Sequence, residues 1–109
     1  MDADIAAQRF AALGNPSRLH IIRLLVQAGA DGLNIGAIGA HTGIPASTLA
    51  HHVRQLVAAG LIRQERRGRE TCTIAAFDTL DALHGYLFTA CCRGAPHAEA
   101  KPALEGAER

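Results

Sequence analysis

The spacing of apolar residues changes at Gly60, and this change constrains the fold more than any other feature of the sequence. Before Gly60, apolar residues recur every three or four positions, as they do along one side of a helix. After it, Leu61-Ile62 and Thr71 to Ile74 are two short runs typical of β-strands, joined through Arg67-Gly68. The sequence therefore predicts several helices followed by a two-stranded β-hairpin.

Glycines and prolines divide the part before Gly60 into separate helices. A first helix is expected to end at Gly14, and a second to begin at Asn15-Pro16, because Asn is a good N-cap and Pro fits the first turn. Gly29 is expected to end that helix, and a short helix then leads to one that Pro45 begins. The apolar positions expected to face the core are Ile5, Ala6, Phe10, Leu13, Leu19, Ile22, Leu25, Val26, Ile35, Ile38, Leu49, Val53, Leu56 and Val57.

A last helix is expected after the hairpin, with Asp78 as its N-cap. Beyond Arg93, the stretch GAPHAEAKPALEGAER is rich in Ala, Glu and Pro and has almost no large apolar residue. We therefore expect one domain over residues 1–93 and a disordered tail over residues 94–109. A chain of 109 residues is long enough to bury one modest core. The apolar side of the last helix would carry Leu80, Leu83, Leu87 and Cys91.

The order helix, helix, short helix, long helix, hairpin, helix is that of a winged helix-turn-helix, a mainly α fold with a small β-hairpin. The helices near Ile35 to Thr42 and Pro45 to Ala59 would form the helix-turn-helix, and the second would present its outer face to the major groove of DNA. Hydroxyl, guanidinium and amide side chains on that face can bond phosphates and base edges. The predicted DNA contacts of this helix are Ser47, Thr48, His51, Arg54 and Gln55.

The basic residues are concentrated in one part of the chain, although the net charge is only +1. Arg54, Arg63, Arg66, Arg67 and Arg69 fall within sixteen residues. Taken alone, this segment is equally consistent with a solvated arginine-rich hairpin. Next to a helix-turn-helix it favours DNA binding, and the three arginines at positions 66, 67 and 69 are expected to contact phosphates.

Composition excludes several classes of protein. Hydrophobic residues make up 49% of the chain, but no apolar run approaches the roughly 18 residues that span a bilayer, and the start MDADIAAQ does not resemble a signal peptide. Three cysteines are an odd number without framework spacing, so we expect reduced thiols in a soluble, cytoplasmic protein. No Ser/His/Asp order, Gly-rich phosphate loop or carboxylate pair indicates an enzyme.

Two stretches of the chain closely resemble the ArsR-type (arsenic-repressor-type) transcriptional regulators: FAALGNPSRLHIIRLL and HTGIPASTLAHHVRQLVAAGLIRQERRGRETCTI. The resemblance covers about Ala6 to Phe88. It implies a homodimeric repressor that binds operator DNA, expected to be an inverted repeat, and is released by a ligand, often a thiophilic metal or metalloid. It also implies dimer contacts through the first and last helices, which hold Phe10, Leu13, Leu83 and Leu87.

Two metal sites known in this family are not complete here. One uses a Cys-x-Cys pair on the helix before the recognition helix, where this chain has Asn34 and Gly36. The other binds zinc or nickel through Asp and His on the last helix, where only Asp78, Asp81 and His84 are present. Adjacent His51 and His52 point about 100° apart on a helix and cannot chelate one ion well. The resemblance instead places His52 near the core, while His51 points toward the groove.

The three cysteines allow two interpretations. Cys91 and Cys92 follow Leu87 and Phe88 by four residues, so they can complete the apolar side of the last helix. Alternatively they form, with Cys72, a thiolate site for a trivalent arsenical that acts as inducer, within or between protomers. A disulfide between the neighbouring pair is disfavoured, because its ring is cramped. Two alternatives remain: the cysteines are structural in a regulator that responds to zinc, nickel, redox or reactive sulfur, or the protein is a dimerisation adaptor without inducer. No cofactor is expected to be required.

Overall fold

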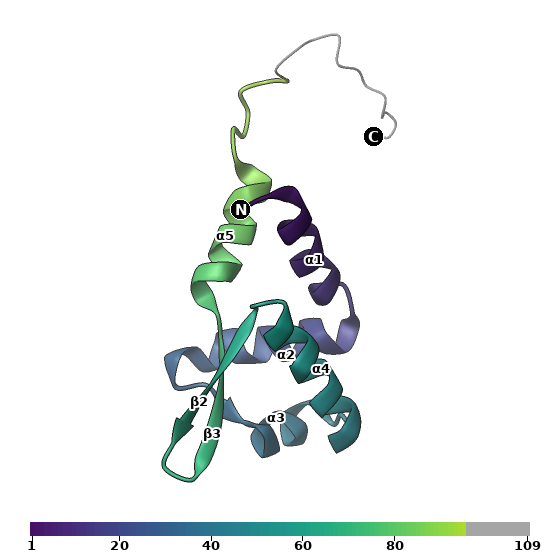
Figure 1. Cartoon of the computed structure of the whole chain (residues 1–109), viewed down its shortest axis with the longest axis vertical. Coiled ribbons are helices and arrows are strands. Elements are labelled where there is room, and N and C mark those ends of the chain that lie inside the picture. Colours follow the sequence, from purple (N-terminus) through teal and green to yellow (C-terminus); the bar gives the residue numbers. More distant parts are fainter. Residues whose placement is uncertain (96–109) are drawn as a thin grey trace.

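In the computed structural model, which describes residues 1–95, the chain begins with two helices, α1 (Ala3–Leu13) and α2 (Pro16–Ala28) (Figure 1). Asn15 caps α2 as predicted, because its side-chain oxygen accepts a hydrogen bond of 3.0 Å from a backbone N–H of the first turn. Gly29, with φ of 72°, ends α2, also as predicted.

The helix-turn-helix is confirmed. The side chain of Asn34 caps its first helix, accepting a hydrogen bond of 2.7 Å from the N–H of Ala37, and Pro45 directly precedes its second helix. Between α2 and the helix-turn-helix lie a single 3₁₀ turn and a very short strand. The elements are η1 (Gly29–Asp31), β1 (Leu33–Asn34), α3 (Ile35–Thr42) and α4 (Ala46–Ala58).

The hairpin is also confirmed, as β2 (Ile62–Arg67) and β3 (Glu70–Ala75), but it belongs to a larger sheet. The strand order is β1-β3-β2, and both pairings are antiparallel. Cys72 on β3 lies opposite Asn34 on one side and Glu65 on the other. The third strand was not predicted, because two residues are too few to show an alternating pattern.

The last helix, α5 (Phe77–Phe88), differs from its prediction at both ends. Ala76 is the N-cap, and Asp78 lies in the first turn, where its charge still interacts favourably with the helix dipole. The helix ends before Cys91, so this cysteine does not continue its apolar side. Thr and Cys are weak helix formers, and the hydroxyl of Thr89 donates a 2.9 Å hydrogen bond back to a carbonyl of the last turn.

The core lies between the helices and the inner face of the sheet. Four predicted core positions are wrong, because the side chains there are exposed: Ile5 by 41%, Leu19 by 45%, Val26 by 44% and Val57 by 41%. The buried side of α2 includes Ile21, which was not among the predicted core positions. The largest fully buried side chains are Ile21, Leu25, Ile38, Leu49, Leu56, Leu61, Thr73 and Ile74.

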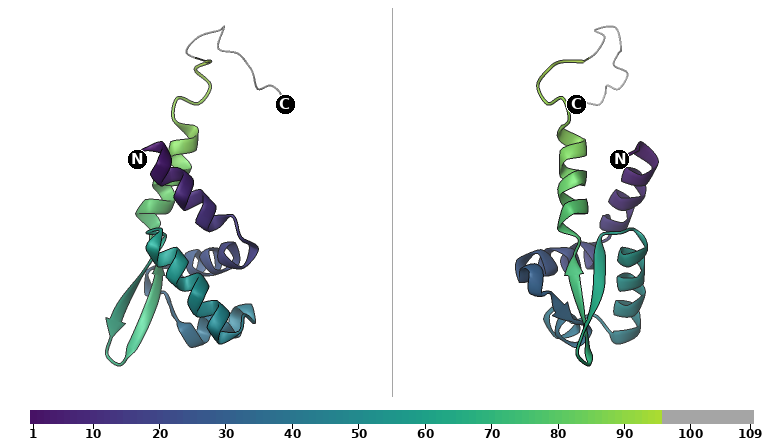
Figure 2. Two further views of the ribbon diagram at one scale, coloured as in Figure 1. Left: turned by 45° about the vertical axis from the view of Figure 1, so that its right-hand side comes forward. Right: turned by 60° about the vertical axis from the view of Figure 1, so that its left-hand side comes forward.

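The helices α1 and α5 contact one another and project from the end of the body that the other elements form (Figures 1 and 2). The α3–α4 pair and the hairpin lie at the other end. No helix in the described part of the chain has the length and apolar character to cross a membrane. The disordered tail predicted from residue 94 lies, from residue 96 onward, outside the described residues.

Candidate nucleic-acid interface

The outer face of α4 carries the side chains that the sequence assigned to DNA. Its inner face is buried through Leu49, His52, Val53 and Leu56, so the opposite face of the helix points outward. Each of the predicted contact positions is exposed, and they lie in the first ten residues of the helix. These exposed positions are Ser47, Thr48, His51, Arg54 and Gln55.

The two neighbouring histidines of α4 have different surroundings, as expected. His51 is exposed, whereas His52 is only 9% exposed and its Nδ1 lies 3.3 Å from Nη1 of Arg18. Burial, followed by the charges of Arg18 and His51, lowers the pKa of His52 from its ordinary value of 6.5. Since a guanidinium only donates, Nδ1 must be the acceptor, which requires neutral His52 with its proton on Nε2.

Arg18 therefore connects three elements, a role that the sequence did not indicate. Its Nε donates a 2.6 Å hydrogen bond to the carbonyl of Ala12 in α1, while its Nη1 donates to His52 in α4. Arg9 makes a second bond between the same helices, because its Nε donates to the carbonyl of Ala59 at 3.1 Å. The recognition helix is thus fixed to α1 and α2 on the side that faces away from solvent.

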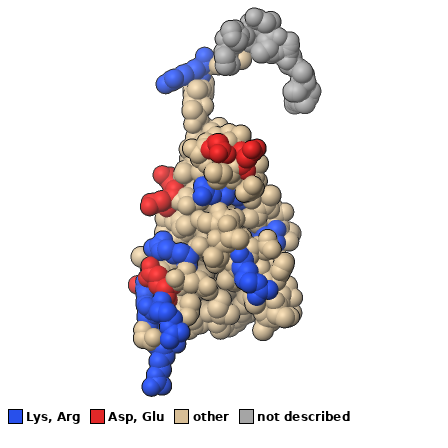
Figure 3. Space-filling model, in the orientation of Figure 1, with Lys and Arg blue, Asp and Glu red and all other residues tan. Residues whose placement is uncertain are grey.

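The wing, which we define as β2, β3 and their connecting turn, carries the densest group of positive side chains (Figure 3). Acidic side chains lie mainly toward the opposite end of that view. Arg66 and Arg69 are exposed near the turn. The wing thus adds positive charge at the end of the molecule that also holds the helix-turn-helix.

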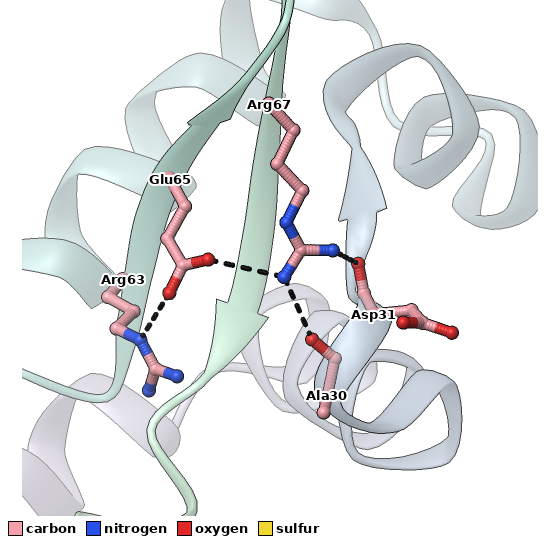
Figure 4. A network of polar contacts seen from close by, with 5 residues as sticks. All are labelled: Ala30, Asp31, Arg63, Glu65 and Arg67. Atoms are coloured by element: carbon pink, nitrogen blue, oxygen red, sulfur yellow. Dashed lines mark hydrogen bonds and ion pairs between the residues drawn. The ribbon is translucent and has the colours of Figure 1, made fainter.

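Arg67 differs from the other two predicted wing contacts, because its guanidinium already has acceptors (Figure 4). Nη1 donates to the carbonyl of Asp31 at 3.1 Å, and Nη2 donates to the carbonyl of Ala30 at 3.3 Å and to Glu65 at 3.2 Å. Arg63 holds the other oxygen of the same carboxylate at 3.2 Å. Hydrogen bonds from Arg63, then Arg67, lower the pKa of Glu65.

The three cysteines are placed at two separate positions. Cys72 lies half-buried in the wing, whereas Cys91 and Cys92 are exposed beyond the end of α5, at the other end of the molecule (Figure 1). The two neighbouring sulfurs lie 2.9 Å apart as free thiols, and the hydrogen bond between them raises the pKa of Cys91. One chain therefore does not bring Cys72 to the pair.

No group of three or more His, Cys, Asp or Glu residues that could hold a metal ion occurs among residues 1–95. Asp78, Asp81 and His84 on α5 therefore do not form a complete site within one chain. The ring of His84 instead lies against that of Phe88, with centroids 5.0 Å apart.

Exposed apolar side chains lie on the two projecting helices. Ile5 on α1 is 41% exposed, and Leu87 and Phe88 on α5 are 64% and 57% exposed. Among the predicted dimer contacts, Leu87 belongs to this surface, but Leu83 is only 2% exposed and packs in the core of its own chain. Phe10 and Leu13 are partly buried against that core.

Comparison with known proteins agrees with this arrangement. Residues 13–65, which include α2, η1, β1, α3 and α4, match a family of helix-turn-helix domains. The HTH-type transcriptional regulator YceK of Bacillus subtilis, itself uncharacterized, is 36% identical over 89 residues, which are 81% of this chain and 88% of YceK.

Solved structures extend the similarity beyond the helix-turn-helix. An ArsR-like transcriptional regulator from Rhodococcus sp. RHA1 superimposes with a TM-score of 0.69 and 25% identity, covering 77% of this chain and 76% of that one. The homodimeric winged helix-turn-helix DNA-binding domain of Mb0332 from Mycobacterium bovis superimposes with a TM-score of 0.64 and 28% identity, covering 86% and 87%. By fold and sequence, this chain belongs to the ArsR-type winged helix-turn-helix transcriptional regulators, which bind DNA and are not enzymes.

Proposed function

We propose that the protein is a homodimeric repressor that binds an inverted-repeat operator through α4 and the wing and is released by a thiophilic ligand. The observation that carries the DNA-binding half is the exposed face of α4 beside the basic wing. Ser47 and Thr48 would bond phosphates near the start of α4, while Arg54 and Gln55 would reach base edges and His51 would line the groove. Arg66 and Arg69 would contact phosphates from the wing.

The exposed apolar surface of α1 and α5 supports the homodimer. Ile5, Leu87 and Phe88 leave large apolar area in water, and a second copy is the simplest partner that would cover it. One recognition helix reads only a few base pairs, so a two-fold pair would read two half-sites about one turn of DNA apart. The homodimeric state of the Mb0332 domain is consistent with this arrangement.

The thiol pair supports the choice of inducer. Cys91 and Cys92 are exposed, and their sulfurs lie 2.9 Å apart, so one trivalent arsenic atom can bind both. Two As–S bonds would form, two hydroxyl groups would leave arsenic, and the two thiol protons would leave with them as water. A methylated trivalent arsenical has only two such positions and suits the pair alone. Inorganic arsenite has three and would need a third thiol, which Cys72 of the same chain does not supply.

Operator release tests both halves of the proposal. The probe is a DNA duplex that the wild-type protein selects from a random pool, and methylarsonous acid and arsenite are added separately to its complexes with wild type, C72S, C91S and C92S. Release by methylarsonous acid should require Cys91 and Cys92 but not Cys72. Equal release from all four proteins, or release from none, would assign the cysteines to packing or to another signal such as zinc, nickel or oxidation. Failure to select any duplex would favour the adaptor.

A further inference from the structure

The connection between α2 and α3 holds the wing by side-chain contacts as well as by strand pairing. Two successive carbonyls of this connection, those of Ala30 and Asp31, accept hydrogen bonds from the guanidinium of Arg67 (Figure 4). The carboxylate of Glu65, two residues earlier on β2, accepts a third. We call these four residues the wing anchor.

Further contacts next to the wing anchor join the same two segments. Nδ2 of Asn34 donates to the carboxylate of Glu70 at 3.4 Å, while Oδ1 of the same side chain caps α3. Gly32 approaches β3 so closely that a Cβ atom there would lie 2.4 Å from the carbonyl oxygen of Thr73. The wing is therefore packed directly against the segment from which the helix-turn-helix begins.

Arg66 and Arg67 are adjacent, but their side chains have different surroundings. Successive residues of a strand point to opposite faces of the sheet, so Arg66 points away from the wing anchor. Within the described residues, Arg66 makes no side-chain hydrogen bond or ion pair, whereas Arg67 makes three hydrogen bonds. A phosphate contact by Arg67 would have to compete with these acceptors, and one by Arg66 would not.

We propose that Arg67 is a positioning residue, which fixes the wing against the α2–α3 connection so that Arg66 and Arg69 reach the phosphates. This inference rests on the proposed contacts of the wing with DNA. A guanidinium donates in several directions within one plane, so it can bond two carbonyls and a carboxylate together. A lysine ammonium is a compact charge that serves a phosphate but does not reproduce this planar set of bonds.

Salt dependence of operator binding separates positioning from phosphate contact. The variants are R67A, R67K and the matched control R66A, measured with the duplex selected by the wild-type protein. R66A should reduce the slope of log affinity against log salt by about 1.8, because each of the two protomers loses one phosphate contact worth about 0.9. R67A should leave the slope unchanged but lower affinity about tenfold at every salt concentration, because fewer molecules hold the wing in place. R67K should bind as weakly as R67A.

Two results of the binding measurements would overturn the inference: a slope for R67A that falls as it does for R66A, or wild-type affinity for R67K. If R67A does not fold, the lysine variant still decides, since a phosphate contact predicts that it binds normally. Amide hydrogen exchange without DNA tests the wing anchor independently of the proposed function. R67A should speed exchange in residues 30–34 and in the wing by at least about tenfold, and R66A should not. Unchanged exchange in R67A would contradict the anchor, whereas a wild type without DNA affinity would contradict only the proposed function.

Discussion

Nη1 of Arg18 lies 3.3 Å from Nδ1 of His52, and this contact joins α2 to the buried side of the recognition helix. Because the pKa of His52 is lowered from 6.5 in the folded chain, the unfolded chain binds the proton more tightly. The free energy of unfolding should therefore decrease as the pH falls below about 6.5, until the folded form is protonated as well.

Urea unfolding at pH 7.5 and pH 5.5 checks this prediction in wild type, H52Q and H51Q. The loss of stability between the two pH values should be smaller in H52Q than in wild type, because glutamine does not titrate. H51Q removes an exposed histidine from the adjacent position and should keep most of the wild-type pH dependence. An H52Q protein with the full wild-type dependence would show that other groups cause it.

Arg54 provides the clearest test of the recognition face. R54A should weaken binding to the selected duplex by about 1–3 kcal/mol, the usual size of a lost bidentate base contact. R23A removes the same charge from an exposed position of α2, outside the proposed interface, and should change the affinity little. Fluorescence anisotropy at fixed salt compares the two. Equal losses in both variants would mean that only total charge matters.

Gly32 and Gly29 form a matched pair for measuring how tightly the α2–α3 connection packs on the wing. Their backbones are alike, with φ, ψ of 64°, −164° and 72°, −154°, a region that only glycine adopts readily. A Cβ at Gly29 meets nothing within 4 Å, whereas one at Gly32 overlaps the carbonyl of Thr73. G29A should cost about 1–3 kcal/mol of stability from backbone strain alone. G32A should cost about 1–3 kcal/mol more, because the added methyl overpacks the contact. Equal urea midpoints would contradict the close approach.

Leu87 tests the proposed dimer surface. L87E places a charge in apolar area that a second copy would bury, so it should shift the protein to monomer at micromolar concentration. V26E makes the same change at an exposed position of α2 and should leave the oligomeric state unaltered. Sedimentation velocity measures both. A wild type that is already monomeric, or an L87E protein that remains dimeric, would exclude this surface.

The sequence predicted those parts of the fold that local chemistry determines. Asn15 begins α2 through its side chain and Gly29 ends the same helix through its backbone conformation, and both predictions are confirmed. The contacts of Arg67 with the α2–α3 connection could not be predicted, because these two acceptors are backbone carbonyls 36 and 37 residues away and carry no side-chain signature. Cys91 was misplaced for a related reason, since helical spacing continues in a sequence whether or not the helix does.

Because strand β1 has only two residues, the α2–α3 connection cannot change in length without disturbing the sheet or α3. Asn34 ends β1, pairs with Cys72 and also caps α3, so strand and helix meet without an intervening residue. One inserted residue within β1 would turn its following side chains to the other face of the sheet or rotate α3 by about 100°. Surface loops usually tolerate such changes, as the turn at Gly68 between β2 and β3 should. Length variation among relatives that keep the wing in this position is therefore expected at the hairpin turn and not between Gly32 and Ile35.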